Sequence, residues 1–220
     1  MVLTGAEVDS IAGLLVLREQ HAFALYASQA TLAVLAGNPI FGVLRPALVP
    51  RRALTMEMPV ELADAEGVPL GLRLRAFPVP GKPPLFAEGT KPDDPDQAIG
   101  LQVSAAGGPA LFFIPGCAAM TPALREALRG AACVLFDGTL WRDDEMLRCG
   151  AGTKTGQRMG HMSISGPEGT LAAFADLGVR RRILIHLNNT NPVLLTDSPE
   201  HAAVRAAGWE VAEDGMEIRL

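Results

Sequence analysis

Two short apolar segments that end abruptly in polar residues constrain the fold of this chain most. Cys133–Phe136 runs into Asp137-Gly138-Thr139, and Arg182–Ile185 runs into His186. Runs of this length, rich in Val, Ile and Phe, are typical of buried β-strands. Ligands of open α/β sheets bind beyond the carboxyl ends of the strands, so both polar segments are candidate parts of a site.

The order of the other expected elements supports an α/β fold. Strands are expected at residues 23–27, 72–77, 99–104, 110–114, 133–136 and 182–186. Helices are expected at residues 11–17, 31–36, 121–128, 170–177 and 199–207. Strands first cluster and then alternate with helices, which favours a mixed layered fold over a bundle or a barrel. The glycine-rich residues 148–166 are predicted to form a long loop, and such loops are often functional.

Composition limits the classes of function. A length of 220 residues with 49% hydrophobic residues fits a single domain over residues 1–220. The net charge of -5, without a basic stripe, argues against binding to nucleic acid. The apolar runs are too short to span a membrane, and no signal peptide is visible. The three cysteines lack Cys-x-x-Cys spacing and are expected to be reduced thiols of a cytoplasmic protein.

A first candidate group is Glu7-Val8-Asp9-Ser10, at an expected turn into a helix. Glu7 and Asp9 are two residues apart, so an extended backbone would place both carboxylates on one side. Alternatively, Asp9 or Ser10 caps the helix that follows.

Three further candidates carry titratable side chains. Asp137 follows a buried strand, where it could bind a ligand or bond only to its own turn. His161 lies in the glycine-rich loop, where a lone histidine is more often a surface residue than a ligand. His186 precedes the polar run Asn188–Asn191, which is expected to lock a turn that aims His186, although a purely structural histidine is the alternative.

Seven motifs, in this order and at about this spacing, resemble those of the PqqB family, the metallo-β-lactamase-like proteins of pyrroloquinoline quinone (PQQ) biosynthesis. They are Val2–Asp9, Val79–Leu85, Ile114–Ala118, Leu135–Thr139, Gly152–Gly156, Met159–His161 and His186–Pro192. The likeness runs from Val2 to Leu220. It implies an α/β fold of the metallo-β-lactamase-like αββα sandwich type, with a metal site at one edge of two facing sheets.

This chain departs from the family pattern in two ways. Relatives carry acid-x-Asp-His where this chain has Glu7-Val8-Asp9-Ser10, so Ser10 replaces a histidine ligand. Serine is a poor ligand for a divalent transition metal. The family's N-terminal portion, with a glycine-rich strand and a Cys-rich zinc motif, is also not seen here, so N-terminal strands are expected to be missing. Either a real loss or a misplaced start would explain this.

The metal ligands that follow from the resemblance are Glu7, Asp9, His161 and His186. Two histidines and one carboxylate leave open positions and suit non-haem Fe(II), although Zn²⁺ or another divalent metal would also be held.

The catalytic residues expected beside the metal are Asp137, Lys154 and Arg158. Lys154 or Arg158 would hold the carboxylates of the substrate, and the loop of residues 148–166 would cover it.

The resemblance implies iron- and dioxygen-dependent oxidation of the tyrosine ring of a glutamate–tyrosine precursor of PQQ. Two alternatives are a carrier of PQQ or its precursor to the periplasm and a degenerate, non-catalytic paralogue. The expected partner is a small-molecule or dipeptide precursor of PQQ, and a homodimer of the chain is a second expectation. A hydrolase is disfavoured because too few ligands remain for a dinuclear zinc site.

Overall fold

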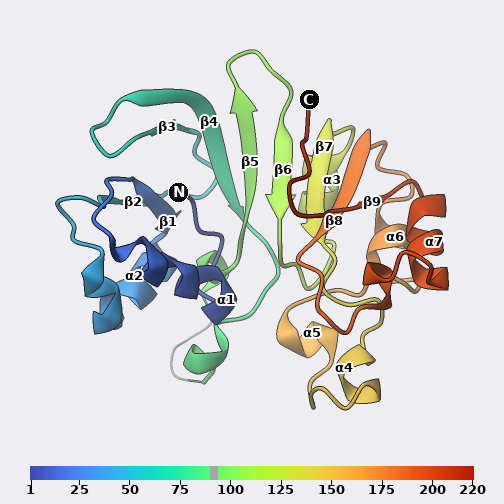
Figure 1. Cartoon of the computed structure of the whole chain (residues 1–220). Helices are drawn as coiled ribbons and strands as arrows, with labels where there is room; N and C mark the ends of the chain where they lie inside the picture. The colour runs from blue at the N-terminus through green and yellow to red at the C-terminus, as the bar shows by residue number, and fades with distance from the viewer. Residues whose placement is uncertain (90–93) are drawn as a thin grey trace. The chain divides into compact units, whose positions relative to one another are not determined.

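The computed structural model describes residues 1–89 and 94–220, which form two compact units (Figure 1). Unit 1 comprises Met1–Pro78 and Lys82–Gly107, and unit 2 comprises Val79–Gly81 and Gly108–Leu220. The sequence Lys91–Asp96, whose prolines and aspartates predict an exposed acidic turn, lies partly outside the described residues. The single domain over residues 1–220 stays a prediction.

Unit 1 contains an antiparallel sheet and a parallel strand pair. The antiparallel strands, in sheet order, are β3 (Val60–Ala63), β4 (Pro69–Pro78) and β5 (Ile99–Ala105). The parallel pair is β1 (Leu25–Ser28) with β2 (Arg51–Leu54). In β4, Leu74 and Ala76 are buried while Arg75 reaches Glu57 and Gln102, as the predicted alternation requires.

Unit 1 also contains short helices. They are α1 (Val8–Ile11), η1 (Ala12–Arg18), α2 (Gln29–Gly37), η2 (Pro39–Val43), η3 (Leu85–Ala87) and η4 (Pro95–Gln97). Ile11, Leu14, Leu25, Leu35 and Phe41 meet in one buried cluster. Burial of these side chains gives the short helices the stability that their length cannot provide.

The predicted start of the first helix is wrong. The N-cap position is Glu7, which makes no side-chain capping bond, and Asp9 and Ser10 lie inside the first turn. Asp9 accepts the adjacent Ser10 N–H at 3.0 Å. The backbone is helical from Val8 onward. An extended segment therefore does not present Glu7 and Asp9 together.

Unit 2 is built on a parallel sheet. Its strands, in sheet order, are β6 (Leu111–Ile114), β7 (Cys133–Asp137), β8 (Arg181–Ile185) and β9 (Glu210–Val211). Register pairs Asp137 at the end of β7 with Ile185 at the end of β8. The two polar segments that follow these strands therefore emerge side by side at one sheet edge.

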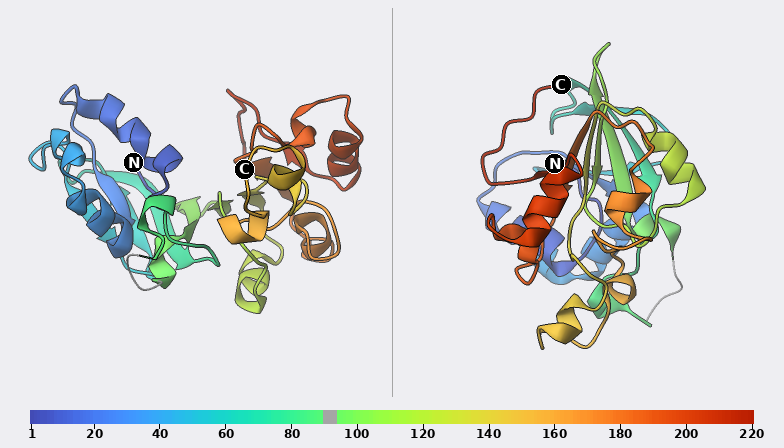
Figure 2. Two further views of the ribbon diagram at one scale, coloured as in Figure 1. Left: turned by 90° about the horizontal axis from the view of Figure 1, so that it is seen from below. Right: turned by 90° about the vertical axis from the view of Figure 1, so that its right-hand side faces the viewer.

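Helices connect the strands of unit 2. They are α3 (Pro122–Leu128), α4 (Glu145–Arg148), α5 (Gly156–Met159), α6 (Thr170–Ala173), η5 (Pro192–Leu194) and α7 (Pro199–Ala206). Both views of Figure 2 place α3 and α6 on the same side of this sheet. Phe174 contacts Phe136 and Trp209 edge-to-face at 4.9 Å in each case, which joins α6 to β7 and β9.

The loop predicted for residues 148–166 contains the single-turn helix α5, so its description as irregular throughout is wrong. Thr155 caps the turn by accepting the Arg158 N–H, and Gly160 ends it with φ of 90°. One turn is too short to show a helical period. Figure 1 shows α4 and α5 beyond the carboxyl ends of β6 and β7.

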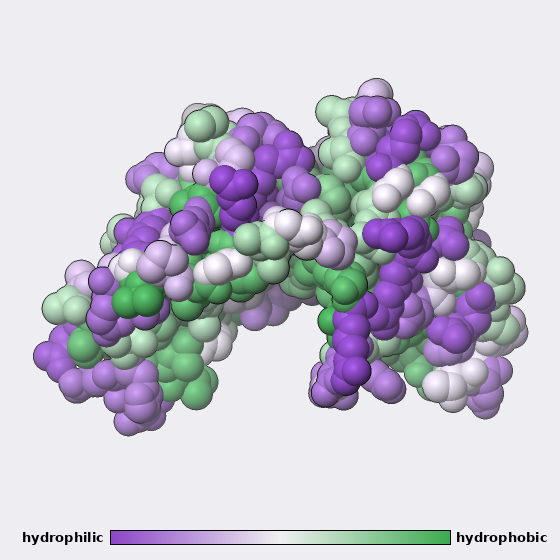
Figure 3. All heavy atoms as spheres, turned by 90° about the horizontal axis from the view of Figure 1, so that it is seen from above, coloured by the Kyte–Doolittle hydropathy of each residue, from purple (hydrophilic) through white to green (hydrophobic). Residues whose placement is uncertain are grey.

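On the face drawn in Figure 3, hydrophilic and hydrophobic residues are interspersed. Within residues 1–89 and 94–220, the helices are all too short or too polar to cross a membrane.

Candidate metal centre

Asp137 is the fully buried anchor of a polar cluster at the carboxyl edge of the parallel sheet. Its Oδ1 accepts the Thr139 N–H at 3.0 Å and the Thr139 hydroxyl at 2.6 Å. Its Oδ2 accepts the Cys117 N–H at 2.9 Å and lies 2.8 Å from His161 Nδ1. Asp137 thus holds its own turn and also bonds Cys117 and His161, so the alternative that it bonds only to its own turn is wrong, while its part in ligand binding stays a prediction.

His161 follows α5 and is half-buried. Its Nδ1 lies 2.8 Å from Asp137 Oδ2 and 3.0 Å from Thr139 Oγ1. A Cβ at Gly116 would stand 3.4 Å from His161 Cε1, so glycine leaves the ring the space that it occupies. The His161 loop is therefore directed at the sheet edge.

His186 directly follows β8, with a left-handed φ of 56°. Its Nδ1 lies 2.8 Å from Thr139 Oγ1, and its ring stacks on His161 with centroids 5.4 Å apart. A left-handed conformation is uncommon for histidine, so the surrounding turn must hold it.

The polar run after His186 locks that turn, as predicted. Asn191 is 2% exposed, and its Nδ2 donates to Gly138 O at 2.8 Å and Thr139 O at 3.3 Å. The Asn188 N–H donates to Thr139 O at 3.0 Å. The two strand-end turns are thereby fastened to each other.

The residues fit a divalent metal. Asp137, His161 and His186 each offer one ligand atom, and these atoms lie within 4.8 Å of one another. Imidazole and carboxylate donors suit zinc and iron. Burial raises the pKa of the nearby Cys117 thiol to about 12, and its Sγ donates to Ala119 O at 3.2 Å, so Cys117 stays a neutral thiol.

Glu7 and Asp9, the predicted carboxylate ligands, belong to unit 1. Glu7 Oε1 accepts from Lys82 Nζ at 3.0 Å, and its Oε2 accepts the Leu85 N–H at 3.3 Å. Their role as metal ligands stays a prediction.

Lys154 and Arg158, the predicted substrate-binding cations, belong to unit 2. Lys154 is half-buried in the loop before α5, and Arg158 is exposed on α5. Their contact with substrate carboxylates stays a prediction.

Two residues of the site were given no role from the sequence. Thr139 Oγ1 contacts Asp137 and both histidines. A threonine two residues after an aspartate at a strand end often bonds to it, which was the available signal. Glu145 is 5% exposed, and it accepts the Trp141 N–H at 2.7 Å and the Thr190 hydroxyl at 2.6 Å. No sequence pattern indicates that Glu145 is buried, because it follows two acidic residues and resembles part of an exposed acidic run.

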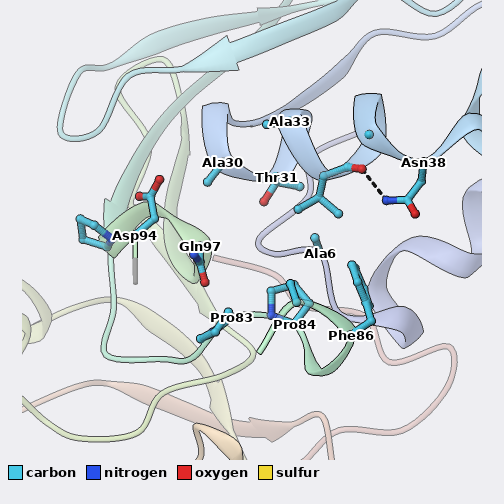
Figure 4. A pocket seen from close by; sticks show the side chains of 14 residues that line it. Ala6, Ala30, Thr31, Ala33, Asn38, Pro83, Pro84, Phe86, Asp94 and Gln97 are labelled. Carbon is cyan, nitrogen blue, oxygen red and sulfur yellow. Dashed lines mark hydrogen bonds between the residues drawn. The ribbon is translucent and has the colours of Figure 1, made fainter. Parts of the chain in front are cut away.

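Unit 1 contains a separate pocket of about 670 Å³ (Figure 4). Small side chains of α2 line one side, and Pro83, Pro84 and Phe86 lie opposite. Asn38 at its end donates to Val34 O at 2.6 Å. The lining is mostly apolar and includes none of Asp137, His161 and His186.

Comparison with known proteins begins with family models. Residues 1–187 match the beta-lactamase superfamily domain. The crystal structure of YhfI from Bacillus subtilis, a metallo-beta-lactamase fold protein, matches with a TM-score of 0.62 at 11% identity, covering 98% of this chain and 75% of that one. At that identity the likeness concerns the fold alone.

Similar proteins of higher identity include coenzyme PQQ synthesis protein B of Gluconacetobacter diazotrophicus, 54% identical over 99% of this chain and 72% of the relative. The protein of the same name from Xanthomonas oryzae pv. oryzae is 54% identical over 100% of this chain and 72% of its own length. The crystal structure of Zn²⁺-bound PqqB from Methylobacterium extorquens matches with a TM-score of 0.91 at 43% identity, covering 100% of this chain and 72% of that one. The predicted metallo-β-lactamase-like fold is therefore confirmed.

Proposed function

We propose, from the premise that this chain belongs to the coenzyme PQQ synthesis protein B family of the β-lactamase superfamily, that it acts in PQQ synthesis as a metal-dependent oxygenase. Its substrate would be a glutamate–tyrosine precursor, oxidised on the tyrosine ring. The observation that carries the proposal is the convergence of the His161 and His186 imidazoles on the buried carboxylate of Asp137 at one sheet edge, where Asp137 bonds His161 and the hydroxyl that contacts both rings.

The donor set supports a divalent metal, and we propose iron for the reaction. When bound, iron would supply the activation of dioxygen, which two imidazoles and a carboxylate suit by leaving positions open. The crystallised relative carries Zn²⁺, and zinc would compete for the same donors.

The chain's own residues would orient the donors and the substrate. Asp137 and Thr139 hold the two imidazole rings through their Nδ1 atoms. Lys154 and Arg158 would bind the carboxylates of the precursor, since cations hold carboxylates strongly where water is partly excluded.

The test is single-turnover chemistry on metal-loaded protein. Protein loaded anaerobically with Fe²⁺ is mixed with a glutamate–tyrosine dipeptide, dioxygen and a two-electron reductant such as ascorbate, because one oxygen atom would enter the ring while the other leaves as water. The product is read by mass spectrometry as addition of one oxygen atom. His186→Ala should abolish the product. Arg158→Ala should raise the dipeptide concentration that gives the half-maximal single-turnover rate, whereas the control Arg148→Ala, which removes an exposed arginine paired with Asp144, should not. Protein with full iron occupancy that leaves the dipeptide unchanged would overturn the proposal.

Ser10 favours a second candidate, a carrier of PQQ or its precursor. Ser10 is exposed on α1. It stands where the family pattern has a histidine, so a metal site that used this position would have one imidazole fewer. Equilibrium dialysis would separate the two: tight binding of PQQ by metal-free protein, without turnover of the dipeptide, supports carriage.

A further inference from the structure

A single hydroxyl, that of Thr139, lies at the centre of the metal-centre cluster. Thr139 is 8% exposed, and its Oγ1 lies 2.6 Å from Asp137 Oδ1, 3.0 Å from His161 Nδ1 and 2.8 Å from His186 Nδ1. All three distances are those of hydrogen bonds. One oxygen atom thus has to satisfy three partners.

The supply of protons decides which partner donates. A threonine hydroxyl has one proton and two lone pairs. Asp137 also accepts two backbone N–H groups, from Cys117 and Thr139, so its carboxylate acts as an acceptor. The hydroxyl proton therefore goes to Asp137, through the shortest of the three contacts.

The two histidines must then donate to the Thr139 oxygen. His186 donates from Nδ1 to Thr139, and His161 shares its Nδ1–H between Thr139 and Asp137. Each ring is consequently the Nδ1–H tautomer, and each presents Nε2 as the atom with a lone pair for a metal.

The same count of hydrogen bonds gives Asp137 a supporting role. Its two oxygens take four hydrogen bonds, and its side chain has no exposed surface. A metal ion would have to displace one of these bonds to reach it. Asp137 is thus better placed to hold the rings than to bind the ion.

We infer that Thr139 is a positioning residue that, anchored on Asp137, fixes His161 and His186 as Nδ1–H tautomers with Nε2 as the metal donor. The tautomer part stands on the hydrogen bonds alone, and the metal part rests on the proposed function. The Thr139 hydroxyl bonds the Nδ1 atoms of both histidines, the nitrogens that would face away from the metal. Loss of such supporting partners typically weakens metal binding by about 10–100-fold.

The first experiment needs no metal. Protein labelled with ¹⁵N-histidine is studied at about pH 8, above the ordinary imidazole pKa of about 6.5, where long-range ¹H–¹⁵N correlation distinguishes the tautomers. We expect Nδ1–H at both His161 and His186. An Nε2–H tautomer at His186 in the wild-type protein would overturn the inference without reference to any variant.

The second experiment compares variants of nearly equal shape. Thr139→Val removes the hydroxyl and should release the His186 tautomer, while His161 should keep part of its preference through Asp137. Thr139→Ser should restore both. Thr170→Val is the matched control, because Thr170 is fully buried in the same unit and its hydroxyl bonds only Ser163 O among the bonds found for it.

Zn²⁺ serves as the diamagnetic probe of the metal part. Its dissociation constant should rise about 10–100-fold in Thr139→Val and stay near the wild-type value in Thr139→Ser and Thr170→Val. Equal affinity and unchanged tautomers in Thr139→Val and Thr170→Val would refute the inference. If the tautomers and Zn²⁺ binding respond as expected but iron-loaded protein does not oxidise the dipeptide, the proposed function fails alone.

Discussion

Removal of the Asn191 side chain should destabilise the protein far more than removal of its neighbour Asn189. Asn191 is 2% exposed, whereas Asn189 is exposed in the same run of polar residues. The Asn191 amide donates to Gly138 O and Thr139 O, and its oxygen accepts the Val193 N–H at 3.0 Å. Asn191→Ala removes this partner from the Gly138 O and from the Val193 N–H, whereas Thr139 O keeps the bond from the Asn188 N–H.

The magnitude follows from that count. A buried hydrogen bond contributes about 1 kcal/mol net, and a buried group that loses its partner costs about 1–3 kcal/mol. Three bonds, of which one is long, predict a loss of about 3 kcal/mol in the free energy of unfolding. For a chain of this size, this corresponds to a fall in Tm of about 6–12 °C.

The assay is urea unfolding of wild type, Asn191→Ala and Asn189→Ala, followed by tryptophan fluorescence and circular dichroism. We expect Asn189→Ala within about 0.5 kcal/mol of wild type, as is usual for exposed sites. A loss below about 1 kcal/mol for Asn191→Ala, with an unchanged dependence on urea, would refute the view that this amide fastens the two strand-end turns.

Three further predictions concern pH, thiol reactivity and the altered ligand. The Arg181 guanidinium lowers the pKa of Glu210 from its ordinary value of 4.5. The pair therefore stabilises the fold above about pH 4.5, and this stabilisation is lost as pH falls through the folded-state pKa of Glu210. The difference in unfolding free energy between wild type and Glu210→Gln should narrow on acidification, and a constant difference would contradict this. At about pH 8, a thiol reagent should modify exposed Cys149 in the native protein and Cys117, with its pKa raised to about 12, only after unfolding; equal rates would argue against the burial. Ser10→His should bind Fe²⁺ more tightly in equilibrium dialysis, and unchanged affinity would count against Glu7–Ser10 as part of the site.

The sequence was sufficient to predict the strand ends at the centre of the site. Cys133–Phe136 is apolar because a parallel strand is buried on both faces, and Asp137 interrupts it where the strand ends. The same reasoning located His186. Parallel strands then bring their carboxyl ends together, which the register of Asp137 with Ile185 bears out.

Strand β2 could not be predicted, because it begins with two arginines. Arg52 is tolerated there since its guanidinium donates to the Tyr26 hydroxyl at 2.6 Å and to Asp64 O at 2.7 Å, and lies 5.3 Å from the Tyr26 ring centroid. These partners come from segments distant in the sequence. The sequence pattern of residues 38–52 does not indicate these partners of Arg52.

The side chains that support the site were also beyond prediction. Glu145 is buried because Thr190, 45 residues away, donates to it, and local sequence does not reveal such a partner. Thr139 matters because two loops deliver histidines to the same oxygen atom. Motifs identify the titratable groups, whereas three-dimensional packing determines which neutral groups hold them.

The stacking of His161 on His186 places one imidazole from the loop after α5 and one from the end of β8 within reach of one ion, so ion binding would stabilise the folded sheet. An ion that binds only the folded chain stabilises it by about 2.7 kcal/mol at a concentration 100 times its dissociation constant. Tm would then rise by about 5–10 °C. Melting curves recorded with a series of divalent ions would rank their affinities, with zinc above iron as imidazole and carboxylate donors generally dictate. The thermal stability of the folded chain would thus report which ion the site prefers, without substrate or turnover.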